Sequence, residues 1–342
     1  MQPYGVDRAE GGIMGFACAE FQNRVRATRL WAAAALILIA ISPGRAAVSD
    51  ADAEQGIIEC AADHLKKHNP DLAGKPDRLF CFLAYVSNFN TAPRQIKGKN
   101  QFLGVPHWVV HNVERAEQSP EKKDRPDKWF TVPDLADGGI APTDASYAFS
   151  KAFRDTHKNW FERGHLAQKY LAERLGGKSG FFTHNVVNAV PQRSQFNKGP
   201  WLTLECYTGA WANKFGEVWV IAGPIFARNK PLTFLKSDSN KKALPVAIPV
   251  SMFKIVVRKE TGGDLAVLGF IYPQTHKSYA KGPFDPGRFM HTIAEIERLT
   301  GEEFLSGAPN SAGLKNQTGV KLWSVAATDF DTGCKNQKAT VP

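Results

Sequence analysis

The sequence contains no CxxC pair, no internal repeat, no long low-complexity stretch and no apolar run of about 20 residues, the length that crosses a bilayer. Without CxxC, a cysteine-based zinc site is not expected. His107 and His111 stand in His-Trp-Val-Val-His, which lacks the glutamate of a zincin and reads as a strand rather than a zinc-binding helix. The hydrophobic fraction of 43% excludes wholesale disorder.

The charge of the chain points to an anionic partner. Its 342 residues carry a net charge of +10, and the first 46 hold five arginines against three acidic residues, so +8 remains for the rest. A positive field steers polyanions towards a protein and raises their rate of encounter. The excess alone does not choose between nucleic acid, acidic polysaccharide and a membrane surface.

The N-terminus has the order of a secretory signal peptide. Basic residues at 24–29 precede an apolar run at 30–41, which Ser-Pro-Gly ends, and small residues follow at 46 and 47. The run is short for a transmembrane helix, so an uncleaved anchor is only an alternative. We expect residues 1–47 to be removed, with Met14 as an alternative start. The mature protein is then expected to be secreted or periplasmic, without stable membrane association.

Cysteine usage agrees with export. Cys18 lies in the segment to be removed, which leaves Cys60, Cys81, Cys206 and Cys334. An even number of cysteines in an exported chain favours two disulfides. Three pairings are possible; proximity favours Cys60 with Cys81, and elimination then joins Cys206 to Cys334.

Three segments are expected along the mature chain. Residues 48–78 have helix-like apolar spacing and form a helical N-terminal extension. Residues 79–310 form the main domain, and residues 311–342 form a tail that its cysteine can tie down. His64 and His68, four residues apart beside lysines, are expected on a solvated face rather than at a metal.

The main domain is predicted to be α+β. Short runs rich in aromatic and branched residues indicate strands, and one later segment has helical spacing. The strand-like runs are 82–86, 108–113, 217–226, 250–258 and 265–272, and the helix-like segment is 289–299. Because strands and helices do not alternate as βαβ units, the pattern favours an antiparallel sheet.

The segment 161–207 carries the residues suited to catalysis. His165 has an unperturbed pKa near neutrality, which suits a general base. Arg163 lies two residues away and, in a strand, on the same face. An arginine there disfavours the imidazolium form of the histidine and can hold a phosphate.

Downstream, Asn197, Trp201 and Glu205 have i, i+4, i+8 spacing, which places them along one side of a helix with Pro200 in its first turn. An amide oxygen and a distant carboxylate make a sparse site for a hard cation, and magnesium accepts few protein ligands. The alternative is that Asn197 caps the helix, Glu205 is solvated and the upstream histidine is a surface residue.

Four motifs, in this order, resemble the DNA/RNA non-specific endonuclease family of ββα-metal (His-Me finger) nucleases. They are Arg163-Gly164-His165, Asn188-Ala189-Val190-Pro191-Gln192, Phe196-Asn197-Lys198-Gly199 with Trp201, and Leu204-Glu205. The resemblance covers roughly residues 79–310. It implies an α+β, ββα-metal nuclease fold in which helices flank a central antiparallel sheet.

The resemblance implies a role for each motif residue. His165 matches the base that activates water, Asn197 the direct ligand of Mg²⁺, for which Mn²⁺ can substitute, and Glu205 a carboxylate that reaches the ion through water. Arg163 matches a phosphate-binding arginine. Arg125 matches one that offsets charge on the phosphate.

Other residues have looser assignments. Arg115 is the alternative to Arg125, and Asn188 and Gln192 match substrate-side motif positions with supporting roles. His184 is expected to be structural. Four cations near the motifs could extend a phosphate track, although each alone reads as a solvated charge: Lys169, Lys178, Arg193 and Lys198.

One departure from the family pattern concerns Glu162, which stands where the family usually has aspartate before Arg-Gly-His. The extra methylene puts the orientation of the motif in question. The expected function is Mg²⁺-dependent hydrolysis of DNA and RNA to 5′-phosphate products. The alternative is a nuclease fold without turnover that only binds nucleic acid or another polyanion. The sequence identifies neither an inhibitor protein nor an oligomeric state.

Overall fold

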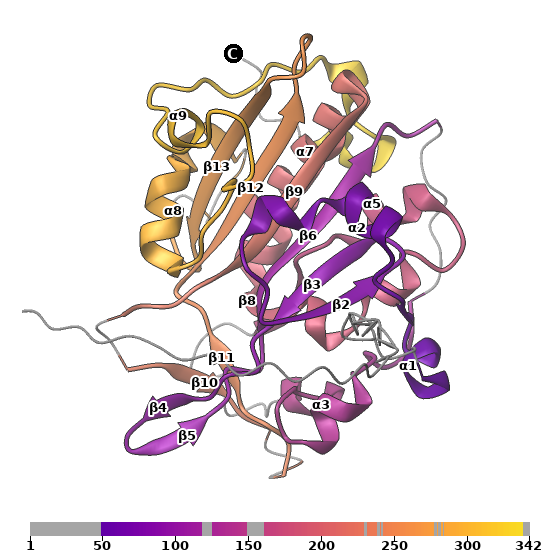
Figure 1. Ribbon diagram of the computed structural model, residues 1–342, viewed down its shortest axis with the longest axis vertical. Coiled ribbons are helices and arrows are strands. Elements are labelled where there is room, and N and C mark those ends of the chain that lie inside the picture. Colours follow the sequence, from indigo (N-terminus) through magenta and orange to yellow (C-terminus); the bar gives the residue numbers. More distant parts are fainter. Residues whose placement is uncertain are drawn as a thin grey trace, which may run out of the picture. The chain divides into compact units, whose positions relative to one another are not determined.

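The computed structural model describes residues 49–117, 125–148, 161–228, 231–237, 240, 242–276, 279, 282 and 284–337 (Figure 1). The predicted signal segment and the last five residues of the tail lie outside these ranges. All described residues belong to one compact unit, Ala47–Pro342. Among them, no helix is long and apolar enough to cross a membrane.

An antiparallel sheet of eight strands forms the centre of the unit, in the order β1-β2-β3-β6-β9-β12-β13-β14 (Figure 1). Its long members are β6, β9, β12 and β13, where the predicted apolar runs lie. The strands are β1 Ile57–Ile58, β2 Arg78–Phe82, β3 Tyr85–Phe89, β6 Pro106–Glu114, β9 Glu217–Ile225, β12 Ser251–Lys259, β13 Leu265–Pro273 and β14 Met290–His291. The predicted α+β fold with a central antiparallel sheet is confirmed.

Alternation along the strands builds one hydrophobic core on each face of the sheet. On β6, Val109 and Val113 enter one core, whereas Trp108 and Val110 enter the other. Successive side chains of a strand point to opposite faces, so a strand buried on both faces is apolar throughout. The long helix α7 (Leu202–Phe215) packs on the first face.

Shorter elements surround the sheet. The other α-helices are α1 Asp50–Glu54, α2 Ala62–His68, α3 Pro133–Asp137, α5 Lys169–Ala172, α6 Ser194–Phe196, α8 Ile293–Thr300 and α9 Ser311–Lys315. Three hairpins complete the strands: β4 Arg94–Ile96 with β5 Lys99–Gln101, β7 Phe161–His165 with β8 Ala189–Arg193, and β10 Thr233–Leu235 with β11 Val246–Ile248. The 3₁₀ turns are Pro70–Ala73, Asp144–Tyr147, Glu173–Leu175, Phe181–Thr183, Val186–Asn188, Pro286–Phe289, Ala327–Asp329 and Thr332–Gln337.

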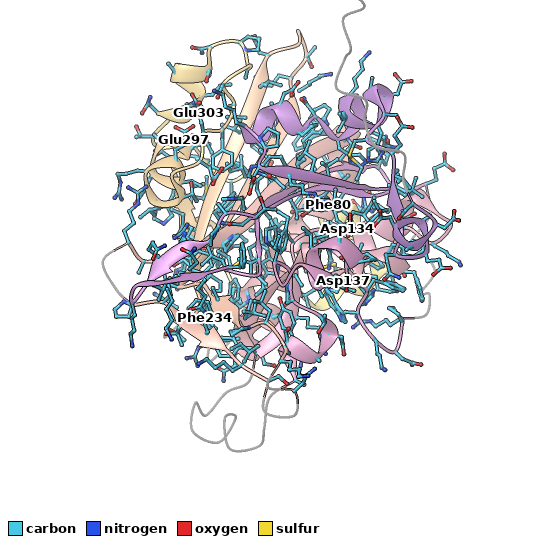
Figure 2. The ribbon with its side chains drawn as sticks, turned by 60° about the horizontal axis from the view of Figure 1, so that its bottom comes forward. Phe80, Asp134, Asp137, Phe234, Glu297 and Glu303 are labelled. Carbon is cyan, nitrogen blue, oxygen red and sulfur yellow. A yellow bond between two sulfur atoms is a disulfide. The ribbon has the colours of Figure 1, made fainter. Side chains whose placement is uncertain are left out.

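Helix α3 illustrates how a short helix covers the core. Leu135 is fully buried, whereas Asp134 and Asp137 are exposed on the outer side of the helix (Figure 2). Phe80 of β2 is buried in the same core as Leu135. A salt bridge of 3.8 Å between Asp134 and Arg78 joins this helix to β2.

The N-terminal extension is helical only in part. Ile57 and Ile58 form strand β1, which pairs with β2 at the edge of the sheet. The disulfide Cys60–Cys81 closes the same junction, and this pairing confirms the expected one. The spacing of apolar residues predicts a helix here. In the structure, the backbone N–H and C=O groups of this segment instead find hydrogen-bond partners on β2, which local spacing cannot reveal.

The expectation that His68 faces solvent is wrong, because the side chain is fully buried. Its Nδ1 accepts a hydrogen bond of 3.1 Å from the backbone N–H of Asn112, and its Nε2 lies 3.3 Å from the carbonyl of Leu83. Strand β3 begins at Tyr85, so it has no residue to pair with Asn112 on β6. The imidazole occupies the missing strand position, and burial lowers the pKa of His68 to about 3.

The C-terminal segment wraps α7. The disulfide Cys206–Cys334 ties it to the helix, as expected by elimination. A buried salt bridge of 2.6 Å joins Arg174 to Asp331, and the Trp211 indole donates a hydrogen bond of 3.0 Å to the carbonyl of Trp323. These contacts tie the C-terminal segment to α7 and to the turn Glu173–Leu175.

Candidate active site

The hairpin of β7 and β8 presents the Arg-Gly-His motif. The two strands are antiparallel, with Arg163 opposite Pro191 and His165 opposite Ala189. Gly164 lies directly beneath the side chain of Gln192, so a Cβ at this position would collide with it. Both amide atoms of Gln192 are buried and lack a hydrogen-bond partner among the described residues. The side chain of Gln192 therefore fills the space against Gly164, and only glycine fits at position 164.

After β8 the chain turns into a helix with a break. Asn197–Trp201 forms a π turn, in which Gly199 has non-helical φ/ψ angles of −110° and −107°, and α7 follows from Leu202. Pro200 has no N–H to donate, which favours a break at this point. Trp201 and Glu205 share the continuous helix, whereas Asn197 lies before the break. The expected single helix side is thus divided into two pieces.

Trp201 joins the helix to the hairpin. Its indole is fully buried, and Nε1 donates a hydrogen bond of 3.2 Å to the carbonyl oxygen of His165. The end of β7 and the start of α7 are therefore fixed to each other. This hairpin followed by a helix is the ββα arrangement that the motifs predict.

His165 lies among aromatic rings. The Trp129 ring centroid is 4.7 Å from that of His165, and the His184 ring stands perpendicular to it at 4.8 Å. The ring is partly exposed, but its Nε2 is buried and has no partner in the described part of the chain. Burial lowers the pKa of His165 well below its usual value; His184, when it is protonated, and the charges of Arg125 and Lys169 lower it further. The imidazole is consequently neutral at pH 7.

His184 is structural, as expected, and also forms a wall of the site. Its Nδ1 lies 3.0 Å from the carbonyl of Phe181, and the side chain is 2% exposed. Burial lowers the pKa of His184 to about 4. A neutral ring beside His165 adds no fixed positive charge at neutral pH.

The segment that holds Arg125 docks beside these histidines. Phe130 exchanges backbone hydrogen bonds of 2.8 Å and 3.0 Å with His184 and Val186. Arg125 is exposed, and its charge acts on both histidines. The alternative, Arg115, instead donates a hydrogen bond to the carbonyl of Lys214 at the far end of α7. The geometry therefore favours Arg125 over Arg115.

Arg163 is held by Asp144, an acidic residue that was not predicted from the sequence. Asp144 forms a 2.8 Å salt bridge with Arg163 and accepts a 3.1 Å hydrogen bond from the backbone N–H of Trp129. The guanidinium also lies over the Tyr147 ring at 5.8 Å. Asp144 thus fixes both Arg163 and the aromatic wall of His165.

Asn188 makes three hydrogen bonds that fix the turn after β7. Its Oδ1 accepts from the N–H of Ala167 at 2.8 Å, and its Nδ2 donates to the carbonyls of Ala167 and Thr183, each at 2.9 Å. The side chain is fully buried. These contacts give Asn188 a supporting role and leave little capacity for a substrate.

Glu162 anchors the hairpin to the helix entrance. Its carboxylate accepts hydrogen bonds from Ser194 at 2.9 Å and from Lys198 at 2.7 Å. The side chain therefore braces the start of α6. Lys198 is paired here rather than merely solvated.

The other predicted cations differ among themselves. Lys178 is exposed, and Arg193 lies over the Phe161 ring at 5.4 Å. The prediction that Lys169 is a solvated charge is wrong, because its side chain is buried and forms an ion pair with Glu173. Spacing i, i+4 from the start of α5 to the following 3₁₀ turn brings this pair together.

Glu205 lies on α7 and is buried. The alternative prediction, that Glu205 is solvated, is therefore wrong. Burial raises the pKa of Glu205, while the Lys254 ammonium and the Trp201 indole oppose that rise. Burial lowers the pKa of Lys254, and Glu205 opposes that change. Lys254 was not predicted as a site residue, although this lysine is a single charge inside the apolar run of β12.

The candidate metal donors are few. Among the described residues, no three His, Cys, Asp or Glu side chains gather around a point that could hold an ion. The side chain of Asn197 is partly exposed and makes no hydrogen bond within the described ranges. The candidate donors are thus the amide oxygen of Asn197 and the carboxylate of Glu205, and magnesium accepts few protein ligands.

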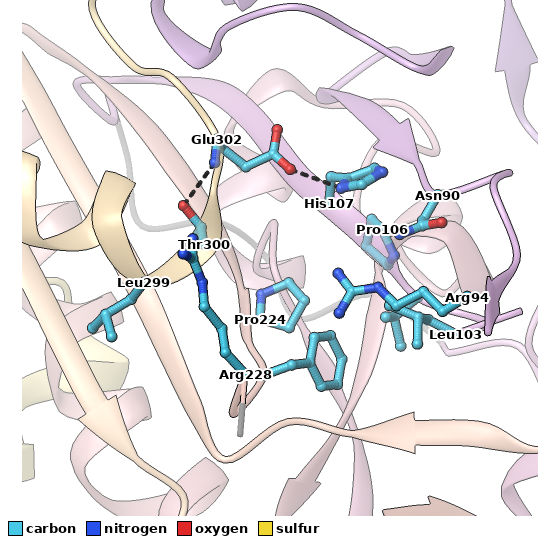
Figure 3. Close-up of a pocket in the computed structure, with 12 residues that line it drawn as sticks. Asn90, Arg94, Leu103, Pro106, His107, Pro224, Arg228, Leu299, Thr300 and Glu302 are labelled. Carbon is cyan, nitrogen blue, oxygen red and sulfur yellow. Dashed lines mark hydrogen bonds and ion pairs between the residues drawn. The ribbon is translucent and has the colours of Figure 1, made fainter. Parts of the chain in front are cut away.

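His107 and His111 lie on β6, as expected, and their side chains have different surroundings. His107 forms a 2.8 Å ion pair with Glu302 at a cavity next to the end of β6 (Figure 3). His111 is buried in the core. Arg94 and Arg228 also line this cavity, but none of the predicted catalytic residues does. The cavity is therefore separate from the β7–β8 site.

Known proteins resemble this chain in sequence. Residues 92–311 match the DNA/RNA non-specific endonuclease family. Human mitochondrial endonuclease G is 27% identical over 212 residues, which are 60% of this chain and 65% of that protein. Mitochondrial nuclease EXOG of Xenopus laevis is 24% identical over 231 residues, 62% of this chain and 56% of that protein. The chain thus spans less than two thirds of these relatives. A nuclease of Nostoc sp. is 28% identical over 222 residues, 62% and 71% of the two chains.

A solved structure shares the fold. A chain in the crystal structure of an EndoG/EndoGI complex, described as revealing the mechanism of EndoG inhibition, aligns with a TM-score of 0.54 and 19% identity. The alignment covers 73% of this chain and 94% of that chain. The family match covers more than half of the sequence, and the ββα arrangement agrees with it. The chain belongs to the DNA/RNA non-specific endonuclease family of nucleases, whose members generally depend on a metal ion.

Proposed function

We propose that the protein is an exported, Mg²⁺-dependent endonuclease that hydrolyses DNA and RNA without sequence preference and leaves 5′-phosphate ends. The observation that carries the proposal is the Trp201 hydrogen bond to the His165 carbonyl, which fixes a neutral histidine beside the π turn of Asn197 and the helix of Glu205. A base next to a sparse oxygen donor set suits metal-assisted phosphodiester hydrolysis.

His165 is the proposed general base. Its lowered pKa keeps the imidazole neutral at pH 7 and ready to accept a proton from the attacking water. Nε2 is enclosed, so Nδ1 is the nitrogen that can face that water. Trp129 and His184 restrict the ring to one orientation.

Asn197 and Glu205 are the proposed metal-binding residues. Asn197 would hold Mg²⁺, or Mn²⁺ in its place, through its amide oxygen, and Glu205 would do so through water. The free amide of Asn197 and the buried carboxylate of Glu205 fit that assignment. When bound, the ion supplies a Lewis acid that polarises the phosphate and stabilises the leaving oxygen.

The arginines have separate proposed tasks. Arg125 is exposed and free to approach a phosphate, where it offsets the charge that builds up during attack. Arg163, held by Asp144, presents a fixed positive charge on the face of β7 that also carries His165. Contacts with phosphate rather than bases give little sequence preference and a strong dependence on salt.

Export is proposed from the N-terminal segment and the two disulfides. Disulfides persist in oxidising compartments and are rare in the cytosol. Cys60–Cys81 and Cys206–Cys334 fit a secreted or periplasmic protein. Mass spectrometry of the protein recovered from culture medium and periplasm would identify the mature N-terminus; an intact residue 1 in the cytosol contradicts export.

The test of the activity is cleavage of plasmid DNA and of an unstructured RNA by purified protein, with Mg²⁺ and with excess EDTA. We expect both substrates to be degraded with Mg²⁺ and neither with EDTA, and the products to accept ligation as 5′-phosphates. Cleavage that EDTA does not affect would contradict the metal assignment. Salt-dependent binding without cleavage would instead support the non-catalytic polyanion binder.

A further inference from the structure

Lys254 is a buried cation on the strand that faces α7. It lies in the middle of β12, with 2% of its surface exposed. Met252 and Val256, two residues to either side, lie in the core that contains α7, so Lys254 points to the same face. A lysine at such a position is rare unless an anion or a ligand compensates its charge.

The surroundings of the ammonium are unusual. Within the described residues, no carboxylate oxygen lies within 4.0 Å of Nζ, and Nζ makes no hydrogen bond. Nζ instead lies 4.2 Å from the centroid of the Trp201 ring. Glu205 is the acid whose charge acts on it. The charge of Lys254 also acts on His111, a buried residue of β6. Trp201 and Glu205, in contrast, both belong to the proposed site.

The contacts of Lys254 reach both halves of the ββα unit. Trp201, on which the ammonium rests, donates its N–H to the carbonyl of His165. Glu205 follows Trp201 by one turn of the same helix. A change at Lys254 therefore acts on the base through Trp201 and on the metal donors through Glu205.

We propose that Lys254 is a positioning residue: its ammonium fixes the Glu205 carboxylate by charge and the Trp201 ring by a cation–π contact, and thereby orders the metal-binding side of the site. This inference rests on the proposed function. Lys254 touches neither substrate nor reacting atoms. Replacing residues that orient metal donors in this way typically lowers metal affinity by about tenfold to a hundredfold.

The test is Lys254→Met, which keeps the length of the side chain and removes its charge. Removing one partner of a buried charge pair leaves the other charge without compensation, and Glu205 is buried beside Lys254. We therefore expect a lower melting temperature for the variant, as for the uncharged control described below, and the metal measurements separate the two. The Mg²⁺ concentration for half-maximal cleavage should rise about tenfold, and Mn²⁺ binding without substrate, measured by calorimetry, should weaken by the same factor.

Val256→Ala is the matched control, because it changes an uncharged, fully buried residue on the same face of the same strand. The control should lose stability and keep the wild-type metal requirement. Lys254→Arg retains the charge and should restore metal binding relative to Lys254→Met; it also provides a second comparison if the methionine variant does not fold.

A double-variant cycle with Glu205→Gln tests whether Lys254 acts through Glu205. In that background, Lys254→Met should cause no further loss of Mn²⁺ affinity. Wild-type Mn²⁺ affinity in Lys254→Met, or losses that add in the double variant, would overturn the proposal. If the wild type binds Mn²⁺ but cuts no nucleic acid, the proposed function fails while the Mn²⁺ cycle still decides the role of Lys254.

Discussion

Two tryptophans of the same helix region offer a controlled test of the active-site geometry. Trp201 and Trp211 are both fully buried, and each donates Nε1 to a backbone carbonyl, at 3.2 Å and 3.0 Å. The acceptor is His165 for Trp201 and Trp323 for Trp211. Replacing either indole by phenylalanine removes one N–H and leaves one partly buried carbonyl without its donor.

The expected loss of stability is similar for the two variants. An unsatisfied, partly buried carbonyl costs about 1 kcal/mol, and the smaller ring adds a small cavity in each case. Urea denaturation at pH 7 should therefore show both free energies of unfolding lowered by about the same amount. Because the two variants are expected to lose similar stability, a difference in their activity reports on the geometry of the site rather than on packing.

Activity should differ between the two variants. Trp201→Phe releases the carbonyl of His165 from the start of α7, so the base can shift relative to Asn197 and Glu205. A displacement of this kind lowers the rate by about tenfold to a hundredfold. Trp211→Phe should keep the wild-type rate of plasmid cleavage under saturating Mg²⁺. Equal rates for the two variants would refute the role assigned to Trp201.

Removing a disulfide should weaken the fold according to the loop that it closes. The double variant Cys206→Ala/Cys334→Ala opens a separation of 128 residues and should lose about 5 kcal/mol, whereas Cys60→Ala/Cys81→Ala opens one of 21 and should lose about 3 kcal/mol. Urea denaturation of both checks this order, and the reverse order would contradict it. His68 should make stability dependent on pH: its folded pKa of about 3 lies below the unfolded 6.5, so the contribution is present above pH 6.5 and is lost as the pH falls towards 3. At pH 5 the loss is about 2 kcal/mol, and a His68→Gln variant with the same pH slope as the wild type would show that another group is responsible.

Much of the sheet can be predicted from the sequence, because its long strands are apolar on both faces. The runs at 217–226, 250–258 and 265–272 correspond closely to β9, β12 and β13. Strand pairing with the extension is harder, since Ile57 and Ile58 gain their partner from β2, 20 residues away or more. Helical spacing in the flanking residues conceals such a short edge strand.

The site can be predicted as a set of residues but not as a geometry. The spacing predicts that Asn197, Trp201 and Glu205 lie along one side of a single helix. The backbone at Gly199 has non-helical φ/ψ angles, so the helix is interrupted between Asn197 and Trp201. The neighbouring lysines suggested a solvated His68, whereas its partner lies 44 residues away on β6. Contacts of this range depend on where a strand ends, which local patterns do not encode.

Two contributors near the site carry weaker signals. Lys254 stands alone among apolar residues of a strand, and that interruption indicates a buried charge with a purpose. Asp144 lies in a short turn, and only its contacts with Arg163 and Trp129 reveal that it organises the site. Lys254 can be found from the sequence, because a charged residue at a core-facing position of a strand stands out. Asp144 cannot be found in this way.

The most direct test of the proposed function is the rate at which His165→Ala cleaves plasmid DNA at saturating Mg²⁺, beside wild type. The variant removes the proposed base and keeps Asn197, Glu205 and the disulfides, so its circular dichroism spectrum should be that of the wild type. Loss of a general base predicts a rate lower by about a thousandfold. A folded His165→Ala protein that cuts as fast as the wild type would contradict the assignment of the base, and with it the proposed mechanism.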